Sequence, residues 1–186
     1  MRVMDVGIFQ GGSLVLFDKL FRPEKLVGLD VRRQPIEALD NYARSRSHIK
    51  IYYGRSQDKV GTVMAARQNF PRGIDLVVDD ASHQYAKSKA TFEMLYPLVV
   101  AGGYYVIEDW AWSHKPAYQA TGATWAAQPA LTNLVFELLV LAGVHSAVEN
   151  VLVTAGLVAI RKGVGILPPE PFELKKYLRG KNLTLI

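Results

Sequence analysis

The sequence predicts an α/β fold: a Rossmann-like doubly wound sheet, mostly parallel, with an antiparallel C-terminal hairpin. Short apolar runs alternate with longer segments of helical spacing along residues 3–107. The run at residues 74–79 is apolar in its middle, as expected of a strand covered on both faces. The last two β-type runs are separated only by residues 154–156, which is too short for a crossover, so they should pair antiparallel.

The expected elements follow in chain order. The first five strands are expected at residues 3–8, 26–31, 49–53, 74–79 and 104–107. The helices between them are expected at residues 12–21, 34–46, 58–68 and 84–100, the last stopped by Gly102-Gly103. A helix at 129–142, a β pair at 146–153 and 157–161, a Pro-rich linker and a short helix at 172–178 complete the chain. We expect one cofactor-binding domain at 1–163 and a C-terminal tail at 164–186.

Composition excludes several classes of protein. The chain has 186 residues, of which 49% are hydrophobic and 21% charged, and it has no cysteine, so disulfides and zinc–thiolate sites are excluded. No apolar run reaches the roughly 18 residues of a membrane span, and no signal peptide is evident, so we expect a cytoplasmic protein without a membrane partner. The net charge of +5 comes without a basic stripe interleaved with aromatic residues, so we expect no nucleic-acid partner. An anionic small substrate remains possible.

Glycines and an acid follow the first two strands, at the sheet edge where doubly wound proteins bind ligands. The segment D-V-G-I-F-Q-G-G-S, residues 5–13, contains Gly7, Gly11 and Gly12, which allow the backbone to approach a ligand closely or simply to turn tightly. Asp30 ends the second strand, 23 residues after Gly7, where an acid can bind both hydroxyls of a ribose. The spacing differs from G-x-G-x-x-G, and the pairing favours an adenosine-type ligand.

Polar residues also follow the third strand. Gln57 and Asp58 could bind the edge of an adenine, whereas Ser56 and Asp58 could equally cap the next helix. Both interpretations stay open, since one residue can serve both roles.

Three carboxylates, Asp80, Glu108 and Asp109, are expected at the ends of the adjacent fourth and fifth strands. Together they would repel one another unless a hard divalent cation such as Mg²⁺ bound them through oxygen. The alternative is that Asp79 and Asp80, with Ser82, cap a turn and the next helix, that Glu108 and Asp109 are solvated, and that His83 is incidental. Trp110, Trp112, His114 and Tyr118 follow the fifth strand and could either bind a flat acceptor or pack over the sheet edge.

The motifs D-V-G-I-F-Q-G-G-S, G-L-D, D-D-A-S-H-Q-Y and G-G-Y-Y-V-I-E-D-W together resemble those of class I S-adenosylmethionine-dependent methyltransferases. They are more narrowly similar to the metal-dependent, mycinamicin-type O-methyltransferases of macrolide sugars and to cephalosporin hydroxylase-like proteins. The resemblance covers residues 4–112. It implies a Mg²⁺-dependent O-methyltransferase that acts on a hydroxyl of a small metabolite, such as a sugar of a glycosylated natural product.

The resemblance also implies roles for individual residues. The cofactor S-adenosylmethionine would be bound by Asp5, Gly7, Gly11, Gly12, Ser13, Asp30, Ser56, Gln57, Asp58 and Asp79. Asp80, Glu108 and Asp109 would bind Mg²⁺, and Trp110, Trp112, His114 and Tyr118 are candidates for the acceptor pocket. Since a sugar hydroxyl is a poor nucleophile, chelation to Mg²⁺ would lower its pKa, and His83 would accept its proton as general base.

The chain departs from the family in two places. Relatives carry helices or a domain before the first strand; this N-terminal lid is absent here, so we expect either an open site or one completed by a partner subunit in a homo-oligomer. Arg55 stands where relatives often have an acid. Three alternatives therefore stay open: a non-catalytic cofactor-binding or assembly subunit, a methyltransferase of a catechol-type acceptor, and a nicotinamide-dependent oxidoreductase.

Overall fold

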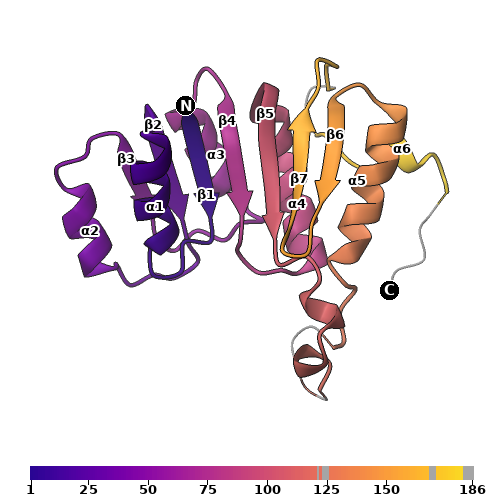
Figure 1. Ribbon diagram of the computed structural model, residues 1–186, viewed down its shortest axis with the longest axis horizontal. Coiled ribbons are helices and arrows are strands. Elements are labelled where there is room, and N and C mark those ends of the chain that lie inside the picture. The colour runs from indigo at the N-terminus through magenta and orange to yellow at the C-terminus, as the bar shows by residue number, and fades with distance from the viewer. Residues whose placement is uncertain (121, 123–125, 168–170, 182–186) are drawn as a thin grey trace.

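The chain forms one seven-stranded sheet with helices on both faces (Figure 1). The computed structural model describes residues 1–120, 122, 126–167 and 171–181. The sheet has the order β3-β2-β1-β4-β5-β7-β6, in which β1 to β5 are parallel and β7 runs antiparallel to both neighbours. The strands are β1 (Arg2–Val6), β2 (Lys25–Leu29), β3 (Ile49–Tyr52), β4 (Ile74–Asp79), β5 (Val99–Glu108), β6 (Val148–Val153) and β7 (Leu157–Lys162). The predicted fold class is confirmed.

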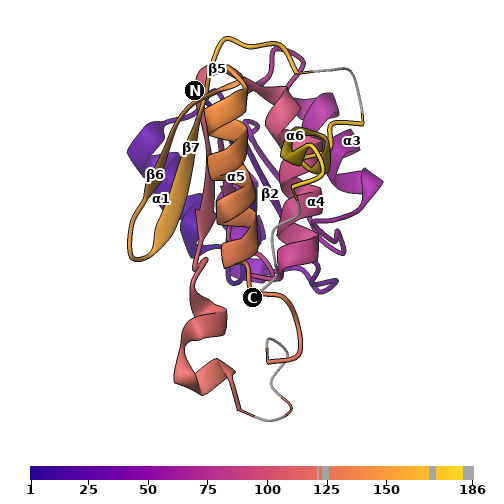
Figure 2. The same cartoon turned by 90° about the vertical axis from the view of Figure 1, so that its right-hand side faces the viewer.

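The helices form two layers, one on each side of the sheet (Figure 2). One layer holds α1 and α2, and the other holds α3, α4, α5 and α6. Their bounds are α1 (Gly12–Phe21), α2 (Glu37–Ala43), α3 (Val60–Asn69), α4 (Tyr85–Leu95), α5 (Thr132–Val144) and α6 (Lys175–Leu178), with 3₁₀ turns η1 (Tyr96–Leu98), η2 (Trp112–His114) and η3 (Pro116–Tyr118).

Each layer has its own apolar core. On one side, Leu14 of α1 and Leu39 of α2 pack with side chains of β1, β2 and β3. On the other, Phe92 of α4 and Leu134 of α5 pack over β1, β2, β4, β5, β6 and β7. Because β1 and β2 contribute side chains to both cores, their residues are buried on alternate faces, as the apolar runs of the sequence require.

Two helices are each six residues shorter than predicted, and each has a proline two residues beyond one end. The helix expected at 84–100 ends at Leu95, because Pro97 cannot donate the next backbone hydrogen bond and restricts the residue before it. The predicted stop at Gly102-Gly103 is wrong: these residues lie inside β5, where the register with β4 shifts. The helix expected at 34–46 is confined to α2, and Ile36, which follows Pro35, is extended.

The C-terminal segment packs against the larger core. Phe172 and Leu174 are buried among the residues of that core, and the backbone N–H of Leu174 donates to Glu93 of α4 at 2.8 Å. Pro168-Pro169 of the expected linker lies outside the described residues. Among the helices described, none combines the length and apolarity needed to cross a bilayer.

The strand order reverses between β1 and β4, so these strands flank the switch point where such sheets bind ligands. A Cβ on Gly7, just after β1, would lie 2.4 Å from the carbonyl oxygen of Asp80, just after β4. The carboxyl ends of β1 and β4 therefore meet in direct backbone contact.

Candidate active site at the carboxyl ends of the strands

A cavity of about 670 Å³ runs along the carboxyl ends of the parallel strands. It is lined by Gly7 and Phe9 after β1, by Leu29, Asp30 and Val31 at β2, by Arg55, Ser56 and Gln57 after β3, by Asp80, Ala81, Ser82, His83, Gln84 and Lys87 after β4, and by Asp109 and Trp112 after β5. All five predicted strand ends thus contribute to one site, since the carboxyl ends of parallel strands lie at one edge of the sheet.

The loop after β1 wraps around the carboxylate of Asp30. Gly7 and Gly11 have φ of +93° and +83°, a region that favours glycine, and Gly11 is the N-cap of α1. The backbone N–H groups of Phe9 and Arg32 donate to the two oxygens of Asp30 at 3.0 and 2.7 Å. Because each oxygen has a second lone pair, Asp30 can still accept hydrogen bonds from a ligand in the cavity.

Asp5 and Ser13 lie behind this loop rather than on the cavity wall. Asp5 is buried, and one of its oxygens accepts a hydrogen bond from the Ser13 hydroxyl at 2.6 Å while the other has no partner among the described residues. This bond ties β1 to the first turn of α1. Gly12 begins α1 and likewise does not line the cavity.

After β3, Ser56 and Gln57 line the cavity, whereas Asp58 turns away to accept bonds from Ser56 and Lys59. Neither Ser56 nor Asp58 caps α3, which begins after Lys59 without a side-chain cap. Asp79 is also buried away from the cavity. Its two oxygens accept hydrogen bonds from Gln57 Nε2 at 3.2 Å and from the Tyr105 hydroxyl at 3.0 Å.

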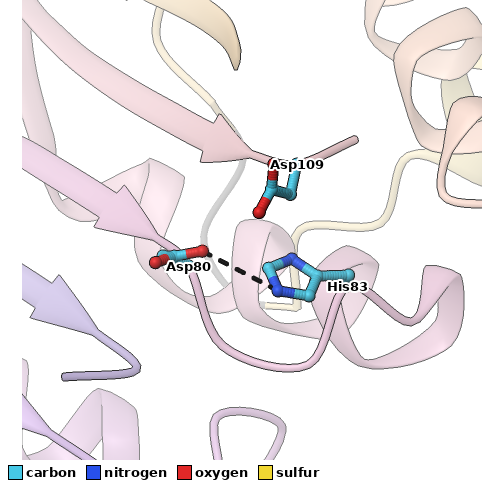
Figure 3. A group of neighbouring side chains, drawn as sticks. All are labelled: Asp80, His83 and Asp109. Carbon is cyan, nitrogen blue, oxygen red and sulfur yellow. Dashed lines mark ion pairs between the residues drawn. The ribbon is translucent and has the colours of Figure 1, made fainter. Parts of the chain in front are cut away.

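The structure brings Asp80, His83 and Asp109 together at the ends of β4 and β5 (Figure 3). One ligand-type atom from each lies within 4.8 Å of the others, and His83 Nε2 is 3.8 Å from Asp80 Oδ1. No side chain caps α4, so the interpretation of Asp80 and Ser82 as helix caps is not supported. Instead Ser82 Oγ accepts a bond from the N–H of Gln84 at 3.3 Å.

Two of these three residues have unusual backbone conformations. His83 and Asp109 both have φ of +52°, and Phe9 at the opposite wall has φ of +46°. Residues other than glycine rarely adopt this region, and such positions cost on the order of 1–3 kcal/mol. The surrounding structure holds them: for example, the N–H of Asp109 donates to Gly156 in the β6–β7 turn at 2.9 Å. Backbone strain of this kind concentrates at functional sites.

The electrostatics at this end of the cavity favour a bound cation. Burial, reinforced by the charges of Glu108 and Asp109, raises the pKa of Asp80 to about 7. Burial likewise raises the pKa of Asp5 to about 7, with the charges of Asp80 and Glu108 adding to it. A divalent cation would offset this repulsion, and carboxylate oxygen with imidazole nitrogen is a donor set that hard or borderline divalent metals accept. The residues present therefore fit a metal ion.

Glu108 differs from the other two predicted metal-binding acids. Its side chain is not part of the close group, although its charge acts on Asp80. Its backbone carbonyl lies close enough to the ring of His83 to raise the pKa of that imidazole. Burial lowers the pKa of His83, against the charge of Asp109, so the imidazole is held in its neutral form.

Comparison with known proteins agrees with this arrangement. A family model described as a methyltransferase domain matches residues 4–110, which is more than half of the chain. The chain belongs to this methyltransferase domain family. The match begins in β1 and ends just after β5, so it contains nearly every strand end that forms the cavity.

Individual relatives of this methyltransferase domain are larger proteins. Mycinamicin VI 2''-O-methyltransferase of Micromonospora griseorubida is 30% identical over 125 residues, which is 63% of this chain and 29% of that protein. The 8-demethyl-8-(2-methoxy-alpha-L-rhamnosyl)-tetracenomycin-C 3'-O-methyltransferase of Streptomyces olivaceus is 33% identical over 126 residues, 63% of this chain and 30% of that protein. The matched segments thus cover less than a third of the length of these relatives.

Among solved structures, the MycE methyltransferase of the mycinamycin biosynthetic pathway, in complex with Mg and SAH, has the same fold. The TM-score is 0.65 with 25% identity, and the match covers 87% of this chain and 45% of that one.

The aromatic residues after β5 lie in a projecting segment of the methyltransferase domain, and of those that the structure describes, Trp112 alone lines the cavity (Figure 1). Tyr118 stacks on Trp112, with ring centroids 4.9 Å apart and an angle of 4° between the rings. Trp110 donates through Nε1 to the carbonyl of Thr154 at 2.9 Å, and His114 Nε2 lies 2.7 Å from Thr132 Oγ1. These contacts hold Trp110, His114 and Tyr118 in place, and their part in an acceptor pocket stays a prediction.

Several residues at the site were not singled out from the sequence. Phe9, Val31 and Lys87 line the cavity, and Tyr105 holds Asp79. The alternation of buried and more exposed residues along β5 could have identified Tyr105, because it lies on the same face of the strand as Ile107. No sequence signal marks Lys87, since only the packing of α4 places it at the wall.

Proposed function

We propose that this chain is the catalytic domain of an S-adenosylmethionine-dependent O-methyltransferase that requires Mg²⁺ and acts on a hydroxyl of a small metabolite. The observation that carries the proposal is one cavity with two chemically distinct ends. Asp30 and Gln57 offer hydrogen bonds at one end, and at the other Asp80 and Asp109 offer carboxylates for a cation with the imidazole of His83 beside them. The named relatives methylate sugar-bearing compounds, which supports a sugar hydroxyl as the acceptor.

The reaction moves a methyl group from the sulfonium of S-adenosylmethionine to the acceptor oxygen, leaving S-adenosylhomocysteine. The sulfonium methyl is already activated, so the protein must position the acceptor in line and remove its proton. A bound divalent cation would lower the pKa of a hydroxyl that coordinates it.

The chain's own residues take the remaining roles. Asp30 would bind the ribose, and Gly7 would allow the cofactor close to the backbone. Asp80 and Asp109 would hold the cation. His83 would accept the acceptor's proton, since burial lowers its pKa and favours the neutral imidazole. Trp112, beside His83, forms the wall on which the acceptor ring rests.

Calorimetry with S-adenosylhomocysteine and with Mg²⁺ tests the two ends separately. Asp30→Ala should weaken S-adenosylhomocysteine binding about tenfold or more while sparing Mg²⁺ binding. Asp80→Ala should remove Mg²⁺ binding and leave the affinity for S-adenosylhomocysteine within a few fold of the wild-type value. Glu149→Gln, an exposed acid far from the cavity, is the matched control and should change neither.

Methyl transfer is then measured against a panel of glycosides and catechols. Transfer that Mg²⁺ restores after chelation supports the proposal, and preference within the panel separates sugar from catechol acceptors. Full transfer in excess chelator would exclude the metal role. S-adenosylhomocysteine binding with no transfer to any member would favour the non-catalytic subunit instead.

A further inference from the structure

Asp79 is a buried acid that the proposed reaction does not use directly. It is the last residue of β4, is 2% exposed and does not line the cavity. Two side chains donate to its carboxylate, the Gln57 amide and the Tyr105 hydroxyl. They form a cage in which each carboxylate oxygen accepts one hydrogen bond.

The cage fixes the orientation of the Gln57 amide. An amide of Gln has a donating and an accepting end, and only its Nε2 end can face an accepting oxygen. Nε2 lies 3.2 Å from Asp79 Oδ1, whereas the reverse orientation would bring two acceptors together. Because Gln57 also lines the cavity, its Oε1 end is left for a ligand there.

Tyr105 in turn fixes Asp79. It is fully buried, and its ring packs edge-on against Phe92, with centroids 5.0 Å apart. The path from the core to the cavity is therefore Phe92, Tyr105, Asp79 and Gln57, each in contact with the next. Such a chain of buried contacts leaves the Gln57 amide little freedom to rotate.

We propose that Asp79 and Tyr105 are positioning residues that fix Gln57 as a reader of the purine base, with its carbonyl set to accept from a 6-amino group. The proposal rests on the proposed function, which places an adenosine-containing cofactor in this cavity. Gln57 then offers an acceptor for the exocyclic amine beside a free N–H for a ring nitrogen, the bidentate pattern by which Gln binds adenine.

The test compares two ligands on each protein, at fixed Mg²⁺. S-adenosylhomocysteine carries the 6-amino group, and S-inosylhomocysteine carries a carbonyl at that position. Calorimetry on the wild-type chain should give at least about tenfold preference for the adenosyl ligand, because one well-made bidentate contact discriminates by that much. The readout is the ratio of the dissociation constants of the two ligands, since a general structural defect would weaken the binding of both alike.

Three variants locate the cause of that preference. Gln57→Met should bring the ratio close to one. Asp79→Asn should lower the ratio to a similar value. The Asn side chain can turn its own NH₂ group toward Gln57, so the orientation of the Gln57 amide is no longer fixed. Tyr105→Phe, which keeps the ring packing but removes the hydroxyl, should lower the ratio about threefold.

The outcomes separate this inference from the proposed function. If the wild type binds neither ligand, the proposed function itself is overturned. If the wild type binds both equally, or if the ratio is unchanged in the folded variants, the positioning role is overturned while cofactor binding stands. Should Asp79→Asn fail to fold, Gln57→Met and Tyr105→Phe decide the question by the same ratio.

Discussion

The imidazole of His83 packs against the indole of Trp112, with ring centroids 4.2 Å apart and planes inclined by 45°. This contact joins the end of β4 to the segment after β5. Trp112 also stacks with Tyr118, so the projecting segment is in contact with His83, the proposed proton acceptor, through Trp112.

Trp112→Ala should therefore lower the rate of methyl transfer by up to about tenfold, because an aromatic pair contributes roughly 0.5–1.5 kcal/mol. Trp112→Phe, which keeps an aromatic face, should retain most of the activity. Steady-state kinetics with calorimetric S-adenosylhomocysteine binding checks this, since cofactor affinity should hardly change. A large loss of cofactor affinity in Trp112→Ala would contradict the assignment to the acceptor side.

The two adjacent acids at the end of β5 should differ in metal affinity. Asp109 belongs to the close group with Asp80 and His83, whereas the Glu108 side chain does not. Asp109→Asn should weaken Mg²⁺ binding about tenfold or more, and Glu108→Gln only a few fold, as expected for an acid that acts through its charge. Calorimetric titration with Mg²⁺ distinguishes them, and the opposite order would place Glu108 among the ligands.

Gly7→Ala should destabilise the fold by at least about 2 kcal/mol, since the new Cβ meets the Asp80 carbonyl at 2.4 Å and the φ of +93° is strained for alanine. Gly143→Ala in α5 is the matched control. Its Cβ would meet nothing within 4 Å, and alanine in a helix should stabilise by about 0.5–1 kcal/mol. Urea unfolding of both variants checks the contrast. Equal stabilities would show that the contact between β1 and β4 can relax.

The buried Lys162 should make stability depend on pH above neutrality. Its Nζ donates to the Tyr96 carbonyl at 3.1 Å, and burial lowers its pKa from 10.5 to about 8. Between pH 8 and 10.5 the unfolded chain binds more protons than the folded one. The free energy of unfolding should therefore rise with pH in this window, at most by about 1.4 kcal/mol per pH unit.

Denaturant unfolding at pH 8, 9 and 10 measures this slope. Lys162→Met should remove the rise while keeping the length of the side chain. Tyrosines of the unfolded chain, with a pKa near 10, also ionise at the top of this window, so the slope is read as the difference between the wild type and Lys162→Met, which share those tyrosines. A wild-type slope equal to that of the variant would mean that Lys162 titrates alike in both states.

The C-terminal segment should contribute substantially to stability. Phe172 is 2% exposed and its ring centroid lies 6.2 Å from that of Phe92. Phe172→Ala should cost about 3 kcal/mol or more in the free energy of unfolding, as in other buried aromatic truncations. Val164→Ala, at a side chain 87% exposed, should change stability by less than about 0.5 kcal/mol. A small effect at Phe172 would mean that the segment is dispensable for the core.

The sequence could predict where the site lies because parallel strands end at one edge. α1 begins and ends where its apolar spacing predicted, and Asp30, Asp80 and Asp109 follow their strands as expected. Side-chain direction was less predictable. Asp79 and Asp80 are adjacent, yet one turns into the core toward Tyr105 and the other into the cavity.

Asp109 joins the close group and Glu108 does not because the backbone turns into the left-handed region at Asp109. The sequence alone does not predict this turn. The same holds for His83. A pattern of residues can place an acid at the end of a strand, but the direction of its side chain follows from the backbone there. The early end of α4, in contrast, could have been predicted from the presence of Pro97.

The left-handed residues Phe9, His83 and Asp109 have a kinetic consequence. Their conformations are set by the sheet and its turns, so we expect these walls of the cavity to keep their shape when a ligand binds. Little ordering entropy is then lost on binding at these positions. Association at this edge of the sheet should accordingly be limited by diffusional encounter and orientation rather than by rearrangement of the loops, and tighter ligands should differ mainly in how slowly they leave.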